Sequence, residues 1–191
     1  MKGGEQMNDD RIIELFFERS EQAIKELDAK YQKTLMKVSF NILNNELDAE
    51  ECVNDTYLAA WNAIPPAKPN PLVAFVCKIV RNISLKRYEH NTAVKRNSFY
   101  DVSLEELDEC LASVTTVEDE INERELVKII ESFLDSLSKE NRVVFLRRYW
   151  FCDSYADIAS QVGITEKNVS VKLSRIRNQL RTYLKERGVF V

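Results

Sequence analysis

The residues of this 191-residue chain best suited to chemistry are cations gathered near its carboxyl end. Between Glu166 and Arg187 there are seven lysines and arginines but only two acidic residues, a net charge of +5. The whole chain has a net charge of −4. A local excess of ammonium and guanidinium groups attracts phosphate, so the segment favours nucleic-acid binding. A solvated amphipathic helix would carry the same charge, and charge alone leaves both interpretations open.

The apolar spacing places these cations on the second of two helices joined by a tight turn. Gly163 follows the first helix, at a position that commonly adopts the left-handed conformation, and Thr165 is a suitable N-cap for the second. The second helix repeats apolar residues at spacings of three and four: Val169, Leu173, Ile176, Leu180 and Leu184. The pattern is typical of a helix-turn-helix, whose second helix enters the DNA major groove.

A second basic surface lies far away in the sequence. The stretch from Lys78 to Arg96 holds six lysines and arginines and one acidic residue, again a net charge of +5. Its apolar residues predict a helix from Leu72 to Tyr88. Before it, the segment from Pro65 to Pro71 contains four prolines in seven residues, which predicts a stiff, exposed, non-helical loop.

An acidic helix face is predicted before the proline loop. Asp48 is a plausible N-cap, with Glu51 placed three residues later as a capping-box partner. One face of this helix is apolar, and the other carries Glu50, Glu51, Asn54 and Asp55. The pattern alone favours an ordinary solvated face with acids at a helix N-terminus.

The predicted fold class is all-α, with two helical domains joined by an acidic flexible linker. The domains are expected at residues 8–96 and 117–187, with the helix-turn-helix in the second. The segment from Asp101 to Glu125 holds ten acids and one arginine. We expect residues 97–116 to be mostly extended, with one short helical turn near Leu104 to Leu111. Fully extended, such a linker reaches about 65 Å.

Several classes of protein are disfavoured. The four cysteines form no C-x-x-C pair, which argues against a zinc site or a disulfide framework and predicts buried free thiols. A catalytic pair of Cys77 with His90 is formally open, but an enzyme is the least favoured class. No signal peptide, membrane span or cofactor is expected, so the chain is expected to be cytoplasmic. Met7 is hypothesised to be the native start.

Three segments resemble the extracytoplasmic-function sigma factors of bacterial RNA polymerase. DAEECVNDTYLAAW is similar to the family's helix that docks on the polymerase clamp. FVCKIVRNISLKRY resembles its reader of the minus-ten element, and YADIASQVGITEKNVSVKLSRIRNQL resembles its reader of the minus-thirty-five element. The resemblance implies core RNA polymerase and promoter DNA as partners and, for many members of the family, an anti-sigma factor.

The resemblance also implies roles for individual residues. It assigns polymerase binding to Glu51, Asn54 and Asp55. It assigns minus-ten DNA binding to Lys78, Arg81, Asn82, Lys86 and Arg87, with Asn82 near a flipped base and the proline loop forming that base's pocket. It assigns minus-thirty-five DNA binding to Lys167, Asn168, Ser170, Val171, Lys172, Ser174, Arg175 and Arg177. Arg175 is the best candidate for a base contact, and Arg177 for a phosphate contact.

Two other classes of function remain as alternatives. A dimeric helix-turn-helix regulator would bind palindromic DNA by itself, whereas a sigma factor is expected to bind selectively only with core polymerase. A helical adaptor without a DNA role would leave both basic surfaces unexplained.

Overall fold

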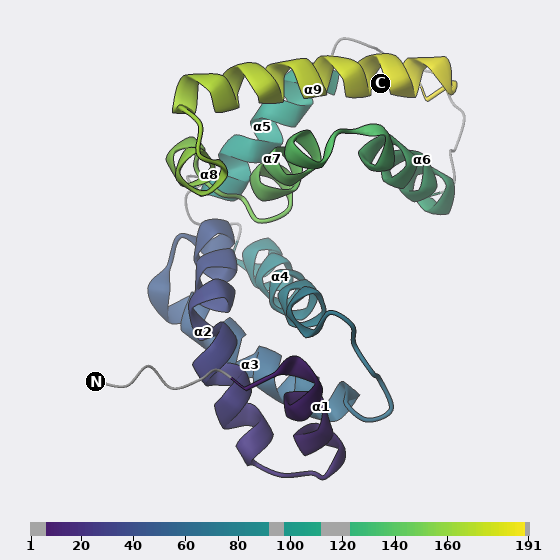
Figure 1. Ribbon diagram of the computed structural model, residues 1–191. Coiled ribbons are helices and arrows are strands. Elements are labelled where there is room, and N and C mark those ends of the chain that lie inside the picture. Colours follow the sequence, from purple (N-terminus) through teal and green to yellow (C-terminus); the bar gives the residue numbers. More distant parts are fainter. Residues whose placement is uncertain (1–6, 92–97, 112–122, 190–191) are drawn as a thin grey trace. The chain divides into compact units, whose positions relative to one another are not determined.

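The computed structural model describes residues 7–91, 98–111 and 123–189 (Figure 1). Within these ranges every regular element is a helix and there is no strand, which confirms the predicted all-α fold class. The chain divides into two compact units, Met1–Ser98 and Phe99–Val191, and each is described by itself. The first six residues, on which the hypothesis of a start at Met7 depends, lie outside the described ranges.

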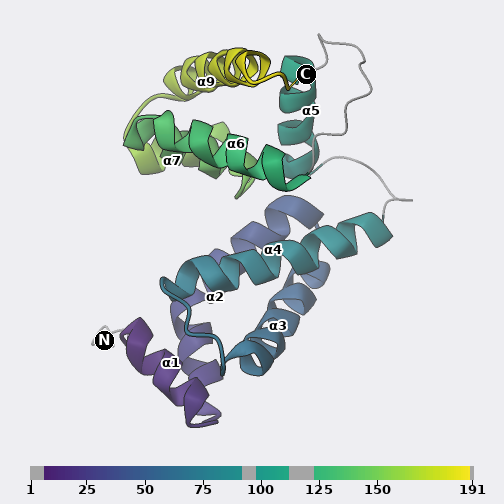
Figure 2. The same ribbon diagram turned by 90° about the vertical axis from the view of Figure 1, so that its right-hand side faces the viewer.

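The first unit is a bundle built around three long helices. Its helices are α1 (Asp9–Phe17), α2 (Gln22–Leu43), α3 (Glu46–Ala63) and α4 (Leu72–His90). Helices α2, α3 and α4 pack against one another, and α1 packs on α2 (Figures 1 and 2). Buried side chains such as Leu35, Val53 and Val76 form one apolar face, or stripe, along each of the three long helices. Those of α3 and α4 are the faces that the sequence predicts. The stripes therefore fix which faces of α3 and α4 point outward.

The start of α3 differs from the predicted one. The side chain of Asn45 accepts a hydrogen bond from the backbone N–H of Asp48 at 3.1 Å, so Asn45 is the N-cap. The prediction that Asp48 caps this helix was wrong. Asp48 lies in the first turn instead, and its carboxylate accepts a hydrogen bond from the side chain of Asn91 at 3.2 Å. The chain from Ile64 to Pro71 is non-helical, as its prolines predict.

The second unit contains the predicted helix-turn-helix. Its helices are α5 (Phe99–Leu111), α6 (Glu123–Ser136), α7 (Lys139–Tyr149), α8 (Tyr155–Val162) and α9 (Glu166–Glu186). One end of the α9 stripe, at Val169 and Leu173, packs with Val144 and Ile158 of α7 and α8. The other end packs with buried residues that include Phe133, Leu137 and Phe145. The long helix α9 is therefore held along its whole length (Figure 2).

The predicted linker contains a longer helix than the short turn expected near Leu104 to Leu111. Residues 99–111 form three turns of α5, which packs against α7 and α9. The expectation of a mostly extended segment was therefore wrong for this part of residues 97–116. The remainder, residue 97 and residues 112–116, lies outside the described ranges.

The turn between α8 and α9 follows the predicted chemistry. Gly163 has φ of 75° and its N–H bonds to the carbonyl of Ala159. The Thr165 side chain accepts a hydrogen bond from the backbone N–H of Asn168 at 3.2 Å. These two residues end one helix and begin the next within three positions.

Replacing Gly163 by alanine should destabilise the second unit by about 1–2 kcal/mol, because an L-residue is strained at this φ. A Cβ at this position would meet no atom within 4 Å, so sterics with neighbours add nothing. Urea unfolding followed by Trp150 fluorescence in a Trp61→Phe background measures the loss. Gly163→Asn is the matched control and should lose less, because asparagine tolerates the left-handed region. Equal losses for alanine and asparagine would contradict this origin.

Candidate nucleic-acid and protein interfaces

The outward face of α9 carries most of the predicted minus-thirty-five residues. Because Val169, Leu173 and Ile176 are buried, the opposite side of the helix faces solvent. The exposed predicted residues are Lys167, Asn168, Ser170, Val171, Ser174 and Arg175. Lys172 lies at the edge of this face, with its Nζ 3.3 Å from a carboxylate oxygen of Glu140. The structure thus gathers a polar and cationic surface around an exposed valine.

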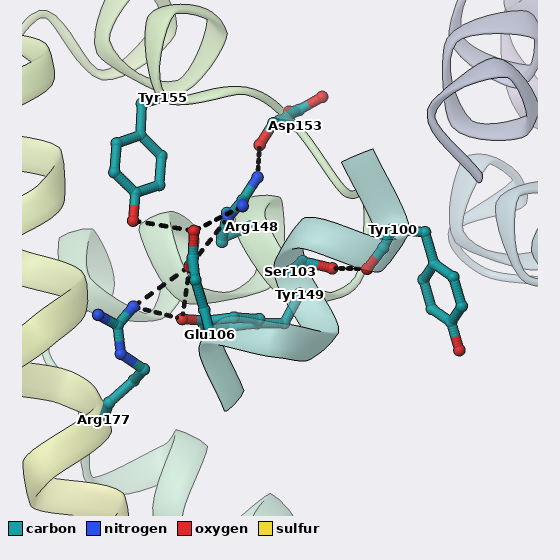
Figure 3. Close-up of polar contacts among 8 residues, drawn as sticks. All are labelled: Tyr100, Ser103, Glu106, Arg148, Tyr149, Asp153, Tyr155 and Arg177. Carbon is teal, nitrogen blue, oxygen red and sulfur yellow. Dashed lines mark hydrogen bonds and ion pairs between the residues drawn. The ribbon is translucent and has the colours of Figure 1, made fainter. Parts of the chain in front are cut away.

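Arg177 does not share that outward face. Its side chain is only 18% exposed and its guanidinium Nη1 lies 3.2 Å from a carboxylate oxygen of Glu106 in α5. The same nitrogen donates to the hydroxyl oxygen of Tyr149 at 2.9 Å. Arg177 therefore points toward α5 and α7, beside the buried stripe, rather than outward with Arg175 (Figure 3).

Glu106 is the centre of a polar cluster within the second unit. Arg148 donates to its two carboxylate oxygens at 2.6 and 3.2 Å, and Tyr149 and Tyr155 donate at 3.3 and 3.1 Å. Arg148 also donates to the backbone carbonyl of Asp153 at 3.0 Å. Burial raises the pKa of Tyr149, and burial together with the Glu106 charge raises the pKa of Tyr155. Both phenols therefore keep their protons and act as donors.

The predicted minus-ten residues separate onto two sides of α4. Lys78, Asn82 and Lys86 are exposed and recur every four residues, so they lie along one side. Arg81 is half-buried near that side. Arg87 faces α3 instead, where its guanidinium lies 2.6 Å from Glu51 and 3.4 Å from Asp48. Lys95 and Arg96, which contribute to the basic stretch, lie outside the described residues.

The acidic face of α3 is exposed and is flanked by two leucines. Glu51, Asn54 and Asp55 are all exposed. Leu47 and Leu58 lie on the same side of the helix and are 78% and 59% exposed. These leucines carry no motif that marks them as functional, although both fall outside the apolar face that α3 buries. Large exposed apolar side chains next to a polar patch indicate a surface that contacts another protein.

Glu51 and Arg87 join two predicted surfaces that lie apart in the sequence. Arg87 is a predicted DNA ligand and Glu51 a predicted polymerase ligand, yet they pair with each other in the first unit. The hydrogen bond from Arg87, together with its positive charge, lowers the pKa of Glu51. The pair fixes the carboxyl end of α4 against the start of α3.

An open groove of about 740 Å³ lies between α1 and the proline loop. Its lining residues are Asp10, Ile13, Glu14, Phe17, Glu18, Lys68, Pro69 and Asn70. The ammonium group of Lys68 lies 5.3 Å from the centre of the Phe17 ring. Three carboxylates at this groove make it a poor site for a phosphate.

The residues considered for catalysis are not brought together. Cys77 is buried, and burial raises its pKa to about 11, whereas His90 is exposed thirteen positions later on the same helix. That spacing separates them by about 20 Å along the axis. Cys52 and Cys152 are likewise buried free thiols, as predicted, and the Cys110 side chain is not described. Across the described residues there is neither a metal-binding group of three or more His, Cys, Asp or Glu nor a helix able to span a membrane.

Comparisons with known proteins match both units. The family model for sigma-70 region 2 matches residues 27–93, and the one for sigma-70 region 4 matches residues 128–180. Together they cover more than half of the chain. ECF RNA polymerase sigma factor SigL of Mycobacterium tuberculosis is 27% identical over 84% of this chain and 88% of its own length. ECF RNA polymerase sigma factor SigE of Mycolicibacterium smegmatis is 22% identical over 83% of this chain and 60% of its own length.

The chain belongs to the extracytoplasmic-function sigma factors. As a sigma factor, it is a transcription initiation factor, and region 4 contains the helix-turn-helix. A solved structure described as CnrH in complex with the cytosolic domain of CnrY is 21% identical. It covers 93% of this sigma factor and 97% of its own chain, with a TM-score of 0.44. Region 2 includes α3 and α4, region 4 includes α7, α8 and most of α9, and α5 lies in neither.

The pairing with Arg87 should hold the pKa of Glu51 below its ordinary value of 4.5. Its stabilising effect should be complete above that value and be lost as the pH falls through the lowered pKa. An NMR titration of the side-chain carboxyl measures the shift. Arg87→Gln should return the pKa toward 4.5, and Lys86→Gln, which removes the same charge from the exposed neighbour, should leave it low. If Arg87→Gln left the pKa of Glu51 unchanged, the ion pair would not form in solution.

Proposed function

We propose that this sigma factor docks on core RNA polymerase through α3 and contacts promoter DNA through α4 and α9. The observation that carries the proposal is the exposed face of α9, which presents Lys167, Val171 and Arg175 opposite a fully buried stripe. Such a helix, placed second in a helix-turn-helix, is suited to the major groove. The proposed role is binding and positioning, without catalysis by the chain itself, in the cytoplasm where the polymerase acts.

The docking surface on polymerase comprises the acidic face of α3 and its flanking leucines. Asn54 and Asp55 supply polar and negative groups, which suit a basic partner and favour correct orientation and rapid association. Leu47 and Leu58 supply apolar area that becomes buried only in the complex. The charge of Glu51 is partly neutralised by its ion pair with Arg87, so Glu51 contributes less to polymerase binding than Asp55 does.

The minus-ten contact uses the exposed side of α4. Lys78 and Lys86 are placed to bind backbone phosphates, and Asn82 between them can donate to and accept from a base edge. Capture of an unstacked base can offset an unstacking cost of a few kcal/mol, which is how binding alone opens DNA. Arg87 is assigned to holding α4 against α3 rather than to DNA, because it faces Asp48 and Glu51.

The minus-thirty-five contact uses the amino-terminal half of α9. Arg175 can donate two hydrogen bonds to a guanine, and Val171 can contact a thymine methyl group. Lys167 and Lys172 are suited to phosphates on either side. An anti-sigma factor, expected from the family resemblance, remains a prediction.

Asn54→Ala with Asp55→Ala should abolish a discrete transcript made by sigma-free core polymerase on DNA upstream of the chain's own gene. The helix should still fold, because both side chains are exposed. Glu21→Ala removes an exposed carboxylate from the N-cap of α2, outside the acidic face of α3, and should leave the transcript unchanged. Tight binding of the unmodified chain alone to a palindrome, with no transcript, would instead indicate the dimeric regulator.

Arg175→Ala should remove about 1–3 kcal/mol of binding free energy and the base preference at one promoter position, because a bidentate base contact is lost. Lys167→Ala should weaken binding to all promoter sequences alike. It should also reduce the slope of log binding constant against log salt concentration by about one, as for a lost phosphate contact. Binding of polymerase holoenzyme to a library of single-base promoter variants distinguishes the two. If Arg175→Ala weakened every sequence equally, its assignment to a base would be wrong.

A further inference from the structure

One acidic side chain of α5, Glu106, contacts three helices of region 4. The α5 helix lies between the two family regions, which end at residue 93 and begin again at residue 128. The described side chains of α5 are absent from both apolar clusters of the second unit. Phe99, Val102 and Leu104 of this helix are exposed, whereas Leu107 is half-buried. Its strongest described contact with α7, α8 and α9 is the Glu106 cluster (Figure 3).

The groups around Glu106 form a carboxylate-binding site, called the receptor below, made of Arg148, Tyr149, Tyr155 and Arg177. Arg148, whose side chain is 3% exposed, presents two nitrogens to the two carboxylate oxygens. Tyr155 donates from α8, and Tyr149 and Arg177 donate from α7 and α9. Three helices of region 4 therefore converge on one side chain of α5. Two arginines beside a single carboxylate favour a negatively charged occupant.

When Glu106 occupies this site, the guanidinium group of Arg177 is turned away from solvent. With Glu106 in place, Arg177 Nη1 is shared between the Glu106 carboxylate and the Tyr149 hydroxyl oxygen. This pairing opposes the contact of Arg177 with a DNA phosphate.

We propose that α5 is a releasable inhibitory helix, held by Glu106 in the Arg148–Tyr149–Tyr155–Arg177 receptor, and that its release frees Arg177 for a DNA phosphate. The proposal rests on the proposed DNA-binding function of α9. Release replaces the carboxylate partner of Arg177 by a phosphate. It also detaches a helix whose described side chains are absent from the two apolar clusters given above.

The decisive experiment measures the affinity of the full-length wild type and of Glu106→Gln for a DNA duplex that spans the region upstream of the chain's own gene. Glu106→Gln should bind more tightly. Its plot of log binding constant against log salt concentration should be steeper by about 0.9, as expected for one added phosphate contact. The gain should therefore shrink about 3.5-fold between 50 and 200 mM salt. Glu105→Gln makes the same charge change one residue away and should not steepen the slope. Adding Arg177→Gln to Glu106→Gln should remove the gain.

Hydrogen exchange measures release directly, without DNA. In Glu106→Gln the amides of α5 should lose protection while those of α7, α8 and α9 keep it. Tyr155→Phe, which removes one donor but keeps the ring, should cause a smaller change in the same direction, and it serves if Glu106→Gln folds poorly. Loss of protection throughout α7–α9 together with weaker DNA binding in these variants would overturn the proposal, because α5 would then be an integral part of region 4.

Transcription by the wild type separates the two hypotheses. If the wild type directs transcription but neither exchange in α5 nor DNA affinity responds to Glu106→Gln, the inhibitory helix is wrong and the proposed function stands. If α5 is released in Glu106→Gln but no variant supports transcription or binds the DNA, the proposed function fails, and with it the part of the proposal that assigns Arg177 to DNA.

Discussion

The second unit depends on the apolar stripe of α9, from Val169 to Leu184. Burial of this stripe against α7, α8 and the end of α6 leaves one side of the helix for solvent. Because successive turns repeat every 3.6 residues, the position of each cation is then set by its distance from the stripe. Arg175 lies opposite the stripe and points outward, whereas Arg177 lies beside it and turns inward to Glu106.

The same constraint explains what could be predicted from the sequence. The stripes of α3, α4 and α9 are long and regular, and Gly163 and Thr165 mark the turn, so the helices and most exposed residues followed from spacing. The cap of α3 was missed because Asn45 and Asp48 are both good capping residues, three positions apart. Local sequence could not choose between them, whereas the contacts of Asp48 with Arg87 and Asn91 in the folded unit could.

The full length of α5 and the partners of three arginines could not be predicted from the sequence, for a related reason. The α5 segment is rich in acids with weak apolar periodicity, so it reads as a solvated linker. Its interaction with Arg148 and Arg177 joins residues more than forty positions apart. Arg87 likewise pairs with Glu51 across two helices. A cation at the edge of a buried apolar face can bind DNA or pair with a carboxylate far away in the sequence. Only the folded structure shows which of the two partners it contacts.

Each unit is built from one continuous stretch of sequence, and this affects how the chain folds during synthesis. Residues up to Ser98 form one compact unit, and α2, α3 and α4 follow one another directly within it. Helical bundles with such local contacts fold in microseconds to milliseconds, whereas ribosomes add about 5–20 residues per second. The amino-terminal bundle can therefore complete its folding on the ribosome several seconds before the last turn of α9 has been translated.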